Sequence, residues 1–280
     1  MPCGNNPLLR ACCDRLPRFE ATLADYAKHS SAATRPLGMF FSEALALVTA
    51  ISLARATHFV ESGTYEAQST ELVARYFGTS LRIFTNDYHE RPGVRERLAR
   101  WPNLVMSVGD SLELLPRYIA SLPRGSRAVV LMDGPKGAPA LKLLHRLFDT
   151  SPSVVLAALH DFSIEGCASA VGNARANATA HLRSAWPVQC FRDSLHEQLL
   201  IDNRTLITTS SLSYRAAFAH LDEGSGLRDG LERQWPSANQ RPLLERTLAL
   251  GPGLWVGARD GASRAAFREA ATISSRGALP

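Results

Sequence analysis

Residues 128–137 read AVVLMDGPKG, in which five apolar residues end abruptly on an aspartate, a Gly-Pro turn and a lysine. A short apolar run bounded by a turn is typical of a strand that is buried on both faces, as in a parallel sheet. Such a strand places Asp133 and Lys136 at its carboxyl end. The lysine is unusual because most basic residues of this chain are arginines, with Lys28 and Lys142 as the other lysines. Unlike arginine, a lysine in a desolvated pocket can lose its proton, so the stretch predicts a base, with a solvated loop lysine as the alternative.

Further apolar runs lie on both sides of this stretch, and helical patterns separate them. The runs cover residues 57–61, 81–85, 104–108 and 154–159, and strand-like segments follow at 188–191, 198–202 and 253–257. Strands that alternate with helices are typical of a parallel sheet. The pattern therefore predicts an α/β protein with a doubly wound, mostly parallel sheet.

The chain divides into three parts. Residues 1–56 are expected to form an N-terminal helical segment that covers the sheet or shapes a pocket. Residues 57–260 are expected to form the α/β domain, which contains an insertion or lid at about 203–250. Residues 261–280 are expected to form a C-terminal tail with a helix and a frayed end.

The composition is that of an ordinary globular protein. With 280 residues and 45% hydrophobic content, the chain can bury a large core. Its formal net charge is +5, but the arginines are spread along the sequence and form no basic patch. No nucleic-acid partner is therefore expected.

The cysteines and the apolar stretches predict a cytoplasmic protein. The five cysteines show neither zinc-site spacing nor a disulfide framework, which is typical of a reducing compartment. The first residues contain no apolar core of the signal-peptide type. The membrane-like stretch 37–54 carries Ser42, Glu43, Thr49 and Ser52. It predicts a buried amphipathic helix, so no membrane partner is expected.

Each predicted strand ends on polar or small residues. These residues are Glu61, Asp87, Asp110 with Ser111, Asp133, and His160 with Asp161. Open parallel sheets bind ligands beyond the carboxyl ends of their strands, so the set predicts a ligand site. For Asp110 and Ser111 taken singly, a helix cap is the alternative.

The first of these loops reads ESGTYEAQS over residues 61–69. A dinucleotide-binding loop would need G-x-G-x-x-G, and here only Gly63 is present. A pyrophosphate could not approach this backbone closely, which disfavours a nicotinamide or flavin cofactor. A tight turn, polar side chains and a helix N-terminus suit a cofactor that carries a carboxylate and an amine.

With these motifs, residues 38–162 resemble a class I S-adenosylmethionine-dependent methyltransferase, most similar to the catechol and caffeoyl-coenzyme A O-methyltransferase type. The family's E-x-G-x-Y-x-G-x-S pattern is matched at Glu61, Gly63, Tyr65 and Ser69, with Ala67 in place of the second glycine. The resemblance implies a Rossmann-like, seven-stranded methyltransferase sheet. It also implies that these loop residues hold the methionine part of the cofactor.

The resemblance assigns roles to the later strand ends as well. Asp87 would bind both ribose hydroxyls, and Asp110 or Ser111 would lie near the adenine edge. The family carries Asp-x-x-Lys after its fourth strand, as residues 133–136 do here. Asp133 would then be a metal ligand or cofactor-side carboxylate, and Lys136 the base that removes the acceptor's hydroxyl proton.

The chain departs from the family after the fifth strand, where metal-dependent members have Asp-Asn and this chain has Asp161-Phe162. Phenylalanine offers no ligand atom, so the family's metal site is incomplete. Asp133 and Asp161 could still bind a divalent cation such as magnesium, with waters as its other ligands. A metal-free enzyme would use His160 or Lys136 as base, and Lys136, His160 and Asp161 are the predicted catalytic residues.

These residues together predict O-methylation of a small-molecule hydroxyl. A methyl sulfonium is already activated, so the enzyme need only align it and deprotonate the acceptor. The alternative, which Ala67 and Phe162 favour, is a non-catalytic protein of this fold that serves as a binding or partner module. A hydrolase or phosphotransferase is disfavoured because the chain has neither G-x-S-x-G nor a P-loop. The oligomeric state stays open, a homodimer included.

Overall fold

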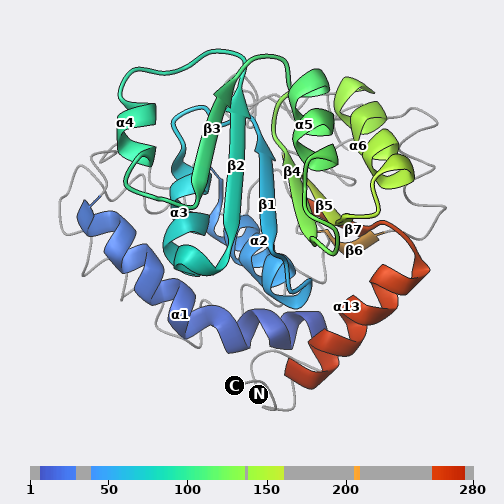
Figure 1. Cartoon of the computed structure of the whole chain (residues 1–280). Helices are drawn as coiled ribbons and strands as arrows, with labels where there is room; N and C mark the ends of the chain where they lie inside the picture. The colour runs from blue at the N-terminus through green and yellow to red at the C-terminus, as the bar shows by residue number, and fades with distance from the viewer. Residues whose placement is uncertain (1–6, 30–38, 136–137, 161–204, 209–253, 275–280) are drawn as a thin grey trace, which may run out of the picture.

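The computed structural model describes residues 7–29, 39–135, 138–160, 205–208 and 254–274 (Figure 1). Within these ranges, the centre of the molecule is a seven-stranded sheet in the order β3-β2-β1-β4-β5-β7-β6. The strands are β1 (His58–Ser62), β2 (Arg82–Asp87), β3 (Leu104–Val108), β4 (Ala128–Met132), β5 (Val154–His160), β6 (Thr205–Thr208) and β7 (Leu254–Ala258). The apolar run at residues 128–132 forms β4, with every residue buried.

Strands β1 to β5 pair in parallel, and β7 runs antiparallel to both of its neighbours, β5 and β6. The predicted α/β class with a mostly parallel sheet is confirmed. The strand-like segment predicted at 253–257 corresponds to β7, whereas those at 188–191 and 198–202 lie outside the described residues.

Helices cover both faces of the sheet (Figure 1). One face packs against α1 (Pro7–His29), α2 (Phe41–Leu53), α3 (Gln68–Phe77) and α13 (Gly261–Ser274). The other face packs against α5 (Ser111–Ala120) and α6 (Ala138–Thr150). In β1, the side chains of Phe59 and Val60 enter opposite clusters, as the alternation of a strand requires. The fold is therefore three layers, with both faces buried at the central strands and the edge strand β3 partly exposed.

The ends of the described chain belong to the same body as the sheet. Of the insertion predicted at 203–250, the structure describes residues 205–208, which form β6. The predicted C-terminal tail contains α13, whose Phe267 is buried in the cluster that it shares with α1. None of the described helices combines the length and the apolar character that crossing a membrane requires.

Cys13, on α1, is disulfide-bonded. The cysteine spacing gave no sign of such a bond, which is more typical of oxidising compartments. The cytoplasmic location therefore stays a prediction.

Candidate functional site

The strand order reverses between β1 and β4. From β1 the chain proceeds outward to β2 and β3, and it then returns to β4 on the opposite side of β1. In open α/β sheets, ligands bind beyond the carboxyl ends of the strands at such a reversal. The loops that follow β1 and β4 are therefore the first place to look for a site.

These two loops touch through their backbones. The amides of Asp133 and Gly134 donate to the carbonyl of Ser62, at 2.8 and 3.0 Å. A Cβ atom on Gly63 would lie 2.9 Å from the amide nitrogen of Gly134, and Gly63 has a φ of +98°. Any side chain at Gly63 would collide with the β4 loop, so contact and backbone conformation both require glycine.

The β1–α3 loop, residues 63–67, continues in a conformation that is unusual for its sequence. Tyr65 and Ala67 have φ values of +47° and +59°, in the left-handed region that favours glycine. Ala67 thus takes a conformation that is more usual for glycine. The amide of Ala67 donates to the carbonyl of Thr64, at 2.7 Å, which closes the loop.

Asp87, at the end of β2, ties this loop to its neighbouring strand. Its Oδ2 accepts the amide of Tyr65, at 2.6 Å, and its Oδ1 accepts the amide of His89, at 3.3 Å. The Asp87 residue is partly exposed. The structure thus brings together Tyr65 and Asp87, two of the predicted cofactor-binding residues.

Glu61 lies fully buried at the base of the same loop. Its carboxylate accepts hydrogen bonds from Ser69 Oγ and Thr85 Oγ1, both at 2.7 Å, and from Thr70 Oγ1. Burial raises the pKa of Glu61, and the charge of Asp133 raises it further, while the three hydroxyl groups act in the opposite direction.

Sequence reasoning found Glu61 and Ser69 but missed the two threonines. Thr85 is the register partner of Glu61 in the parallel pair of β1 and β2. The pairing of these two strands could therefore have indicated this contact.

A second buried group lies where β5 ends. His160 Nδ1 is 2.9 Å from Asp133 Oδ1, and His160 Nε2 is 3.1 Å from Glu43 Oε2. His160 is 2% exposed and Glu43 is fully buried. A neutral imidazole has a single N–H, so hydrogen bonds to both carboxylates require one further proton, on the ring or on a carboxyl group. The His160 ring therefore lies between two carboxylates at the edge of the site.

Glu43 was not among the predicted site residues. It is the only acidic residue of α2, where it also accepts the amide of Phe40, at 2.9 Å. Its position as the one charged residue of a mostly apolar, buried helix was the available signal, because a buried carboxylate needs a partner.

Asp110 and Ser111 lie where β3 leads into α5. Asp110 is the N-cap of α5 and accepts the amide of Leu112, at 2.8 Å, which agrees with the alternative of a helix cap. Ser111 Oγ donates to the carbonyl of Gly134, at 3.3 Å. The start of α5 is thereby attached to the β4 loop.

Two predicted catalytic residues, Lys136 and Asp161, lie outside the described residues, as does Phe162. Within the described part of the chain, no group of three or more His, Cys, Asp or Glu side chains is arranged to hold a metal ion. The described contacts of Asp133 include His160 instead. Magnesium binding by Asp133 and Asp161 stays a prediction.

Comparison with known proteins identifies no relative: no family model matches the chain, and neither the curated proteins nor the solved structures give a significant match. The function is therefore inferred from the contacts of the residues themselves. Hydrogen bonds join three pairs of predicted site residues in the described structure, namely Glu61 with Ser69, Tyr65 with Asp87, and Asp133 with His160.

Proposed function

We propose that this chain is an S-adenosylmethionine-dependent methyltransferase that acts on a hydroxyl group of a small molecule. The observation that carries the proposal is the β1–α3 loop at the reversal of the strand order. This loop rests on Asp87 at one side and on the backbone of Asp133 at the other, with the buried carboxylate of Glu61 beneath it. Ligand sites of doubly wound sheets are built at this place.

The topology supports the proposal. The mostly parallel sheet, with helices on both faces, is compatible with the Rossmann-like sheet that the resemblance to class I methyltransferases implies. Fold alone does not determine chemistry, so the residues of the loops have to be compatible as well.

The β1–α3 loop is compatible with the cofactor. Both positions at which the family pattern has glycine, Gly63 and Ala67, take a positive φ in this chain. The carboxylate of Asp87 has about four lone-pair sites, and the described hydrogen bonds use two of them. Acceptor capacity therefore remains for the two ribose hydroxyls that the resemblance assigns to it.

The role proposed for Glu61 is structural, whereas the sequence indicated that Glu61 binds the cofactor. It has no exposed surface, and it accepts a hydrogen bond from Ser69. We therefore assign to Glu61 the task of holding Ser69 and the first turn of α3 in place. Gly63, Tyr65 and Ser69 would then contact the methionine part of the cofactor.

The bound cofactor would supply an activated methyl group, and the protein would have to hold the acceptor and take its hydroxyl proton. Lys136 and His160 are the proposed bases. Both ring nitrogens of His160 are within hydrogen-bond distance of carboxylate oxygens. For His160 to act as the base, the acceptor would have to replace one of these carboxylates, which makes Lys136 the preferred residue.

Calorimetric titration with S-adenosylhomocysteine, followed by transfer of a radiolabelled methyl group to a panel of hydroxylated small molecules, tests the proposal. Binding together with methyl transfer is the expected result. Absence of binding would refute the methyltransferase. Binding without transfer to any acceptor would favour the alternative, a non-catalytic binding module of the same fold.

A further inference from the structure

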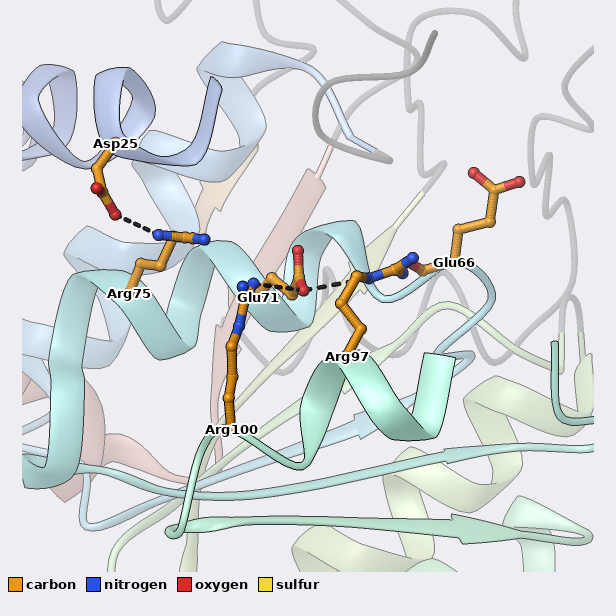
Figure 2. A network of polar contacts seen from close by, with 6 residues as sticks. All are labelled: Asp25, Glu66, Glu71, Arg75, Arg97 and Arg100. Atoms are coloured by element: carbon orange, nitrogen blue, oxygen red, sulfur yellow. Dashed lines mark hydrogen bonds and ion pairs between the residues drawn. The ribbon is translucent and has the colours of Figure 1, made fainter. Parts of the chain in front are cut away.

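A short segment behind the β1–α3 loop contacts three successive residues of that loop. The segment, residues 91–100, contains the five-residue helix α4 (Val94–Leu98). Arg97 donates from Nε to Glu71 Oε1, at 3.2 Å, and from Nη2 to the backbone carbonyl of Glu66. Figure 2 shows Arg97 reaching from α4 between the loop and α3.

The neighbours of Glu66 in the loop are held by the same segment. The guanidinium group of Arg91 lies 4.9 Å from the ring centre of Tyr65. Ala67 packs with Val94 and Leu98 in a small apolar cluster that is separate from the two main ones. Tyr65, Glu66 and Ala67 thus each have a partner in residues 91–100.

These contacts lie where the loop needs support. Tyr65 and Ala67, on either side of Glu66, have a positive φ. Non-glycine residues keep such conformations only where the surrounding structure holds them. The carbonyl of Glu66, which Arg97 binds, belongs to the peptide unit between Glu66 and Ala67. Arg97 therefore fixes the orientation of the peptide unit that leads into Ala67.

We infer that Arg97 is a positioning residue for the site, which locks the β1–α3 loop in the conformation that binds the cofactor. Arg97 acts through the Glu66 carbonyl and does not itself contact the ligand. The inference rests on the proposed function. Arginine suits this task because its planar group serves two acceptors at once, a carboxylate and a carbonyl, in a fixed geometry.

The chain offers a matched control in Arg100. Arg100 Nη2 donates to the same atom, Glu71 Oε1, at 2.7 Å (Figure 2). This is the hydrogen bond that the described structure gives for the Arg100 side chain. Glu71 is 1% exposed, so losing either arginine weakens a buried ion pair. Only the loss of Arg97 also frees the Glu66 carbonyl.

The experiment compares Arg97→Met, Arg97→Lys and Arg100→Met in the full chain. Hydrogen exchange of the ligand-free protein is followed for residues 63–69, where the amides of Tyr65 and Ala67 report on the loop. Binding of S-adenosylhomocysteine is measured by calorimetry, and global stability by urea denaturation. Arg97→Lys keeps a positive charge opposite Glu71, so it serves as the second variant if Arg97→Met does not fold.

Both Arg97 variants are expected to exchange roughly tenfold faster in residues 63–69 and to bind roughly tenfold more weakly, the order that losing one charge-assisted hydrogen bond produces. Arg100→Met should stay within about threefold of the wild type in both measurements, because Arg97 still pairs with Glu71 and still binds the Glu66 carbonyl. Equal effects of Arg97 and Arg100 substitutions would overturn the inference. If the wild type does not bind S-adenosylhomocysteine, the proposed function fails, while the exchange data still decide whether Arg97 holds the loop.

Discussion

Replacing Gly63 with alanine tests the contact between the β1 and β4 loops directly. The added methyl group would lie 2.9 Å from the amide nitrogen of Gly134 and 3.0 Å from the carbonyl carbon of Asp133. Both are atoms of the peptide between Asp133 and Gly134, whose amide, like that of Asp133, donates to the Ser62 carbonyl. They therefore cannot move away without breaking the link between the strands. The substitution also forces an alanine into a φ of +98°.

The size of the effect follows from two additive terms. A left-handed backbone costs an L-residue about 1–2 kcal/mol. Forcing a methyl group into a packed position costs about 1–3 kcal/mol. Gly63→Ala should therefore lower the free energy of unfolding by about 2–5 kcal/mol. The smaller entropy that alanine has in the unfolded chain offsets part of this loss.

Gly125→Ala is the matched control, because Gly125 has a φ of +84° and open space where its Cβ would lie. It should lose only the backbone term, about 1–2 kcal/mol, with the same offset from the unfolded chain. Urea denaturation followed by circular dichroism gives both free energies of unfolding by linear extrapolation. Equal losses in the two variants would refute the close packing of the two loops.

Three further substitutions test individual residues. Asp87→Ala removes the acceptor of the Tyr65 amide and should weaken S-adenosylhomocysteine binding in calorimetry by tenfold or more, whereas the exposed surface substitution Glu113→Ala should leave it unchanged. Lys136→Ala should spare binding and abolish most methyl transfer, and full activity relative to Lys142→Ala would exclude Lys136 as the base. Because the folded-state pKa of Glu61 is raised, the native state holds the proton more tightly, so wild-type stability should fall as pH rises above 4.5. Glu61→Gln should flatten this decline in denaturation series, and an unchanged slope would assign it to other groups.

The parts of the fold that local sequence encodes could be predicted. A continuous apolar run that ends on a polar turn defines β4, because a strand buried on both faces needs apolar residues throughout. Gly63 was identified by the same kind of reasoning, since a tight turn at a strand end needs a residue without a side chain. The polar residues at the strand ends could be expected to lie near one another, because a parallel arrangement brings these ends to one edge of the sheet.

The parts that depend on distant pairing could not be predicted. Glu43 and His160 are 117 residues apart, and no local period connects a helix before the sheet to the end of β5. The contact of Arg97 with the Glu66 carbonyl could not be predicted either, because every residue has a backbone carbonyl and the residue type does not show which one accepts a side chain. Asp110 illustrates the opposite difficulty, in which one residue type suits both a helix cap and a ligand site, and the contact with Leu112 is that of the cap.

The packing of α13 against α1 bears on how the protein is made on the ribosome. Phe19 and Leu23 of α1 share a buried cluster with Phe267 and Ala271 of α13, at the other end of the described chain (Figure 1). Synthesis proceeds from the N-terminus at about 5–20 residues per second. The apolar face of α1 therefore stays incompletely covered for many seconds, until α13 has emerged. Crosslinking at Phe19 in stalled chains of increasing length would follow the burial of this face.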